Sequence, residues 1–118
     1  MIGAAILLCL GGASSSFAHH SFAMFDIKKK MVIDGVVSRY FWTNPHVFIS
    51  LDTQTKAGKT ERYAIEAASI SILSRHGWKV SSIKVGQRIR ATFNPLKNGE
   101  KGGLLIQVQR PDGSILKQ

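Results

Sequence analysis

The chain has 118 residues, with 16 Lys and Arg against 7 Asp and Glu, so its formal net charge at pH 7 is +9. This length allows one domain with a single core and excludes two domains with separate cores. The single cysteine excludes an intrachain disulfide. The positive charge favours anionic partners such as nucleic acid, lipid head groups or acidic polymers, and it also keeps a small protein soluble.

The first 18 residues are typical of an export signal. An apolar run over residues 2–10 is followed by small residues and ends in a Ser-Phe-Ala triplet at residues 16–18, which suits a signal peptidase. The run is far shorter than the roughly 20 residues that a transmembrane helix needs, and no later run is longer. We therefore predict a signal peptide over residues 1–18, no transmembrane segment, and a periplasmic or secreted mature chain that begins at His19.

An arm and three strands are expected next. Residues 19–30 lack a clean hydrophobic period and end in three lysines, which indicates an N-terminal arm. Residues 31–42 are rich in β-branched and aromatic side chains, with Gly35 as a candidate bulge. Residues 46–53 alternate apolar and polar side chains, and residues 60–66 return as a third strand. These three strands are expected to form a meander.

One short helix and two further strands complete the predicted order of elements. The helix is expected within residues 67–76, with Ser69 as its N-cap and Gly77 just after its end. Residues 87–93 alternate again and form the fourth strand. A turn-rich loop leads to the fifth strand over residues 104–110, and a Pro-Asp-Gly turn then leads into a short tail.

Three strands, one helix and two more strands is the order of the OB-fold, a small five-stranded Greek-key barrel. We therefore predict an all-β domain with one short helix over residues 31–118, folded as an OB-fold-like barrel. A β-sandwich is the alternative architecture.

Several motifs give the chain a family resemblance. A His-His-Ser-Phe segment at residues 19–22 opens the predicted mature chain, and a Trp-Thr-Asn-Pro-His motif occupies residues 42–46. A Gly-Trp pair at 77–78 and a Val-Gly pair at 85–86 extend the pattern. In these residues the chain resembles a family of small exported bacterial proteins of unknown function, over nearly all of residues 19–118. The resemblance implies an exported OB-like domain and brings no catalytic residues with it.

The histidines of these motifs are candidate metal ligands. A terminal amine is less basic than a lysine, so the amine and ring nitrogen of His19 can chelate one ion at neutral pH. The imidazole of His46 would complete a T-shaped set of three nitrogens, a histidine brace, which suits copper(II). His20 offers a competing local mode, and Phe22 and Phe25 are placed to dock the arm near His46. The alternative is a flexible terminus without metal and a His46 that only forms a hydrogen bond in its turn.

A second candidate surface combines aromatic and basic side chains of the strands. On an OB-fold such a mixture can form a stacking and phosphate-binding face. Aromatic residues in strands are more often core, and export argues against nucleic acid as the partner. The residues concerned are Arg39, Tyr40, Phe41, Trp42, Phe48, Arg88 and Arg90.

No enzymatic signature marks the chain. It contains no Gly-x-Ser-x-Gly elbow, no His-Glu-x-x-His pair and no Gly-rich phosphate loop. We therefore expect a binding module rather than an enzyme. The favoured ligand is copper(II) at the mature N-terminus, and the alternative is an anionic ligand of the cell envelope, or a protein partner, bound without metal.

Overall fold

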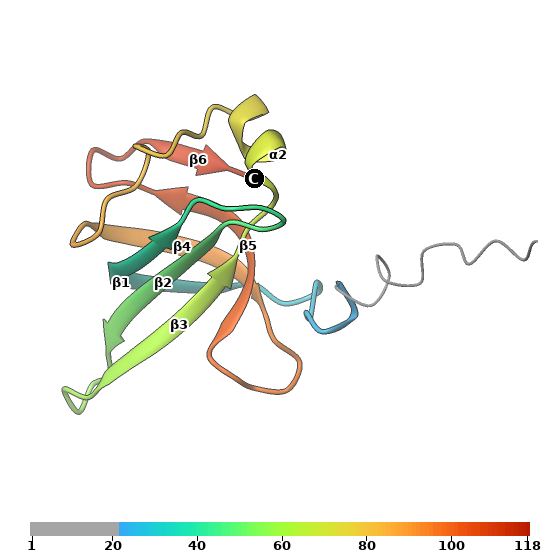
Figure 1. Ribbon diagram of the computed structural model, residues 1–118. Coiled ribbons are helices and arrows are strands. Elements are labelled where there is room, and N and C mark those ends of the chain that lie inside the picture. The colour runs from blue at the N-terminus through green and yellow to red at the C-terminus, as the bar shows by residue number, and fades with distance from the viewer. Residues whose placement is uncertain (1–21) are drawn as a thin grey trace, which may run out of the picture.

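This computed structural model describes residues 22–118, which fold around a single sheet of six strands (Figure 1). A helix, α2 (Ile70–Arg75), lies between the third and fourth strands. The strands are β1 (Met31–Phe41), β2 (Phe48–Gln54), β3 (Thr60–Glu66), β4 (Arg88–Pro95), β5 (Gly102–Gln109) and β6 (Ile115–Lys117).

The sheet closes into a barrel through its third and fifth strands. The strands follow the order β3-β2-β1-β4-β5-β6, and residues 64–66 of β3 also pair in parallel with residues 102–104 of β5. The predicted all-β class and OB-like barrel are confirmed, and the sandwich alternative is wrong. The predicted tail after the Pro-Asp-Gly turn is a sixth strand, because the chain folds back and pairs with β5.

The first strand bends and changes partner along its length. Residues 31–36 pair with β4, and residues 36–41 pair with β2. A Cβ atom at Gly35 would lie 2.9 Å from the carbonyl oxygen of Asp52, so glycine allows the close approach of β1 and β2. The irregularity in the ladder falls between Val37 and Arg39 rather than at Gly35, so the predicted position of the bulge is wrong by a few residues.

The inward faces of the strands form the hydrophobic core. The alternation predicted for residues 46–53 places Ile49 and Leu51 inside, and Ile89 and Phe93 of β4 meet them there. All four side chains are buried. The core is completed by Val37, Val47, Ile65, Leu73, Trp78, Leu105 and Val108.

The short helix is the one that the sequence predicts. The side chain of Ser69 accepts a hydrogen bond from the backbone N–H of Ile72 at 3.3 Å, and Gly77 follows with φ +88°. Leu73 is the buried residue of the helix and packs into the core beside Trp78. No helix within residues 22–118 is long and apolar enough to span a membrane.

Tyr40 links β1 to the segment that follows the helix. Its ring lies 5.9 Å from that of Trp42 between centroids, and its hydroxyl donates a hydrogen bond to the carbonyl oxygen of Lys79 at 3.2 Å. Burial raises the pKa of Tyr40 from the ordinary 10.0 to about 12, because a partly desolvated site disfavours the phenolate.

Tyr40 should make stability depend on pH at the alkaline end. Its contribution to the stability of the folded state is fully present below pH 10.0, where the tyrosine is protonated in both the folded and the unfolded protein. This contribution is lost as the pH rises to about 12. We expect it to lower the free energy of unfolding by about 1 to 2 kcal/mol across this window, since partial contact with solvent screens the effect. Urea unfolding at a series of pH values measures the fall. It should shrink in Tyr40→Phe, and equal pH profiles for Tyr40→Phe and the parent would contradict it.

Candidate functional site

His46 lies in the connection between β1 and β2, beside the end of β3. Its Nδ1 atom is 3.3 Å from the carbonyl oxygen of Ala67 and 3.5 Å from Oε1 of Glu66. A carbonyl oxygen can only accept, so the contact requires Nδ1 to carry the proton. Nε2 of the neutral ring then keeps its lone pair, and the side chain is 40% exposed. A histidine that binds a metal through one ring nitrogen usually donates a hydrogen bond from the other ring nitrogen to a carboxylate or a carbonyl oxygen.

The backbone around His46 is held by hydrogen bonds to the start of the helical segment. Val47 N–H donates to the carbonyl oxygen of Ala68 at 3.0 Å, and Ala67 N–H donates to that of Val47 at 2.7 Å. Oδ1 of Asn44 accepts from the backbone N–H of Ile70 at 3.0 Å. Part of the Trp-Thr-Asn-Pro-His motif therefore fixes the loop that presents the histidine.

A small apolar pocket of about 170 Å³ adjoins His46. Its wall includes Phe22 and Phe25 from the arm, together with Ile72 of α2. Gln118 lies at its edge with its amide satisfied, because Oε1 accepts from Ala68 N–H at 2.7 Å and Nε2 donates to the Leu105 carbonyl at 2.9 Å. Residues of the arm and His46 therefore line the same pocket.

The arm is attached to the barrel by backbone pairing. Phe25 forms an isolated bridge with Leu96, and the N–H of Asp26 donates to the carbonyl oxygen of Pro95 at 2.8 Å. Phe25 is only 4% exposed, whereas Phe22 is 58% exposed. Docking of the arm near His46 therefore depends on Phe25, and Phe22 lines the pocket from its exposed side.

Two of the predicted ligands, His19 and His20, lie outside the described residues. Within residues 22–118 no group of three or more His, Cys, Asp or Glu side chains is arranged to hold a metal ion. A site at His46 with three such ligands would therefore need at least one from outside residues 22–118. Glu66 is the residue that sequence reasoning missed, because its place beside His46 follows only from the register of β2 with β3, where Glu66 lies opposite Phe48.

The predicted aromatic and basic surface divides into two parts. Tyr40 and Trp42 are partly buried and pack against the core, as expected for aromatic residues of this segment. Phe41 and Phe48 are directly opposite each other in the β1–β2 register and both are exposed.

The arginines of that surface have different surroundings. Arg90 forms a two-point ion pair with Asp34 at 2.8 and 3.1 Å. Arg39 and Arg88 are exposed on β1 and β4.

The closed barrel with its short helix defines the chain as an OB-fold-like protein. Its structure is similar to that of a mitochondrial single-stranded DNA-binding protein from S. cerevisiae, with a TM-score of 0.52 and 15% sequence identity. The match covers 76% of this chain and 95% of that one, and at this identity it shows the fold alone. The chain belongs to the family of unknown function DUF6152, whose family model matches residues 6–107. No curated protein matches the chain.

Proposed function

We propose that the chain is an exported, periplasmic or secreted protein that binds copper(II) through His19 and His46. In this proposal a signal peptidase cuts after Ala18, and the new amine and the ring of His19 chelate the ion together. Nε2 of His46 is the third nitrogen. The observation that carries the proposal is the contact of His46 Nδ1 with the Ala67 carbonyl at 3.3 Å, which leaves Nε2 free to bind a metal.

The position of the arm supports the involvement of His19. Phe22 lines the same pocket as His46, and His19 is three residues before Phe22 in the sequence. Three residues span at most about 10 Å when extended. The amine of a chain cut after Ala18 is therefore within reach of His46 once Phe25 has docked.

The chemistry of the donor set favours copper(II). Three nitrogen ligands in a T shape suit its tetragonal preference, and copper(II) binds most tightly among the divalent ions of its series. Oε1 of Glu66 lies 3.5 Å from His46 Nδ1, and a neighbouring carboxylate orients a ligating imidazole and makes it more basic. His20 would serve as a secondary ligand or as the competing local chelate.

Copper(II) titration of matched variants tests this site. The protein should first be shown by intact mass to begin at His19. We expect His46→Ala, and separately one extra alanine before His19, to weaken binding by at least about tenfold, or roughly 1.4 kcal/mol, because the site needs both groups. His76→Ala is the control, since His76 is an exposed histidine at the end of α2 and should bind copper as the parent does.

Two outcomes would contradict the proposed site. Weak binding with the extra alanine but parent-like binding in His46→Ala would indicate a local chelate that involves His20. Equal binding by all four proteins, or binding no tighter than that of free histidine, would exclude a specific copper site.

A second candidate function is supported by the unbalanced positive charge. The ion pairs with carboxylates in residues 22–118 use Lys29, Arg62, Arg90 and Lys101, so most basic side chains there have no carboxylate partner. Anionic groups of the cell envelope are the ligands that such a surface would attract.

A further inference from the structure

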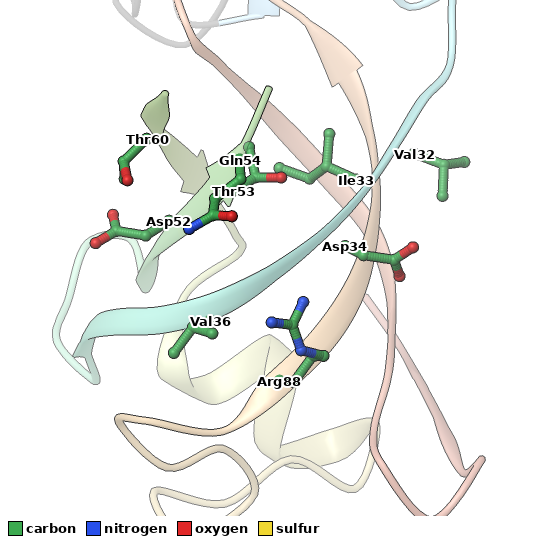
Figure 2. A pocket seen from close by; sticks show the side chains of 9 residues that line it. All are labelled: Val32, Ile33, Asp34, Val36, Asp52, Thr53, Gln54, Thr60 and Arg88. Atoms are coloured by element: carbon green, nitrogen blue, oxygen red, sulfur yellow. The ribbon is translucent and has the colours of Figure 1, made fainter. Parts of the chain in front are cut away.

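A polar cleft opens where β1 leaves β2 to follow β4 (Figure 2). The pairing of β1 with β2 ends at Val36 and Asp52, and beyond this point β1 diverges from the β2–β3 hairpin. The resulting cleft has a volume of about 660 Å³. Gln54 and Thr60 line the hairpin side, and Asp34 lies at the β1 edge with its carboxylate pointing away from the hairpin. This volume lies within the range of sites that enclose small organic ligands, with room for about two or three sugar rings.

Two carboxylates at opposite edges of the cleft are held in fixed positions. Asp52 accepts from Arg62 at 2.7 and 2.9 Å, and Asp34 accepts from Arg90 at 2.8 and 3.1 Å. These hydrogen bonds hold the pKa of each carboxyl below its usual value. An ionised carboxylate accepts about four hydrogen bonds, and the guanidinium takes two of them. Each carboxylate can therefore accept from a further donor, and a hydroxyl group is a neutral donor that suits it.

Neutral polar side chains and an apolar wall complete the lining. The neutral polar side chains of the lining are Thr53, Gln54 and Thr60, and each can donate as well as accept hydrogen bonds, as the hydroxyls of a sugar can. Val32 and Val36 supply carbon surface, which suits the C–H face of a sugar ring. The lining therefore matches a ligand with many hydroxyl groups.

Arg88 adds one positive charge to this cleft. It lies opposite Val36 in the β1–β4 register and is exposed. Its guanidinium forms no ion pair with a carboxylate of residues 22–118, in contrast to Arg62 and Arg90. Its five N–H donors match a carboxylate or a phosphate group. One unpaired guanidinium among hydroxyl-binding side chains favours one acidic group among many hydroxyls.

We propose that this cleft binds a short oligosaccharide that carries one acidic group, a carboxylate or a phosphate. Arg88 binds the acidic group, and Asp52 and Gln54 bind hydroxyls of the neighbouring sugar units. Single-stranded nucleic acid suits the cleft less well, because a phosphate on every unit would lie against two ionised carboxylates.

The cleft is independent of the proposed copper site. His46 precedes the first residue of β2, whereas Asp52 and Gln54 lie at the other end of that strand. Asp52 lies six positions after His46 along an extended part of the chain, which corresponds to about 20 Å. Substitutions in the cleft should therefore leave copper binding unchanged, and failure of either proposal leaves the other standing.

Isothermal titration of the purified chain with defined trisaccharides tests the proposal. The probes are trigalacturonate, a neutral maltotriose, maltotriose that carries one phosphate, and a short oligothymidylate. We expect at least one of the two acidic trisaccharides to bind at least tenfold more tightly than maltotriose. The stronger of the two identifies the acidic group. In NMR spectra recorded with the bound trisaccharide, the backbone amide resonances of residues 32–36 and 52–54 should shift.

Matched variants identify the residues responsible. Arg88→Gln should reduce the affinity for the acidic sugar to that for maltotriose. Arg39→Gln removes an exposed guanidinium from β1 outside the cleft and should bind as the parent does. Thr60→Val removes only a hydroxyl, keeps the side-chain shape, and should weaken both acidic and neutral sugars. The two arginines are exposed and unpaired among residues 22–118, so thermal unfolding of their variants should match that of the parent.

Three results would overturn the proposal. These are no binding of any trisaccharide, equal weakening by Arg88→Gln and Arg39→Gln, and tighter binding of oligothymidylate than of both acidic sugars. The second would indicate nonspecific attraction, and the third would assign the face to nucleic acid.

Discussion

Gly103→Ala should destabilise the barrel by about 3 kcal/mol or more, a large share of the stability of a small domain. A Cβ atom at Gly103 would overlap the carbonyl oxygen of Asn94 and the ring of Phe93. Gly103 pairs with Pro95 on β4 and with Ile65 on β3, so it lies where three strands meet and the barrel closes. Neither the backbone of β4 nor the buried ring of Phe93 can move away without opening this contact.

Chemical denaturation of two glycine variants distinguishes the loss of stability caused by a steric clash from the loss caused by backbone strain. Gly99 has φ +80°, and a Cβ atom there would have no neighbour within 4 Å, so Gly99→Ala should cost only about 1 kcal/mol through backbone strain. Gly103→Ala should lose several times as much. Similar losses for the two variants would show that the approach of β5 to β4 is not as close as the structure has it.

A buried charge at either of two core positions should strongly destabilise the fold. Leu51 and Ile89 are almost fully buried on the inward faces of β2 and β4. An aspartate there would place a carboxyl among apolar side chains with no partner, at a cost of about 4 kcal/mol or more. A domain of this size is stable by only about 5 to 15 kcal/mol in total. We therefore expect Leu51→Asp and Ile89→Asp to lose a large part of this stability and to melt well below the parent at neutral pH.

Circular dichroism melting with an exposed control measures this effect. Val85 is 66% exposed in the connection before β4, so Val85→Asp should melt close to the parent. Cooperative melting of both core variants at the parent's temperature would show that the inward faces of β2 and β4 have been assigned wrongly.

The element order could be predicted because its signals are local. Alternating side chains mark β2 and β4, and Ser69 and Gly77 mark the two ends of the helix within a few residues. The closure of the barrel could not be predicted in this way, because β3 and β5 pair over a long sequence separation and along only three residues each. The strand β6 was missed because its three residues are too short to show a period.

The candidate sites could be predicted only in part. His46 stands out in the sequence because it ends a Trp-Thr-Asn-Pro-His motif, but its partner Glu66 depends on the pairing of β2 with β3. The cleft beside Arg88 depends on the point at which β1 changes partner, which lies one residue after Gly35. Strand register, rather than residue type, therefore decides which polar side chains meet.

The sharing of β1 between two partners determines how the barrel can assemble. The strands β1, β2 and β3 of the meander come early in the chain. Residues 31–36 pair with β4 and the outer edge of β3 pairs with β5, and both of these partner strands come later in the sequence. Until then the meander has two open edges whose backbone groups are free to pair with another chain. Closure therefore joins distant parts of the sequence in one late, cooperative step. Failure of that step should produce edge-to-edge aggregates rather than a half-folded monomer.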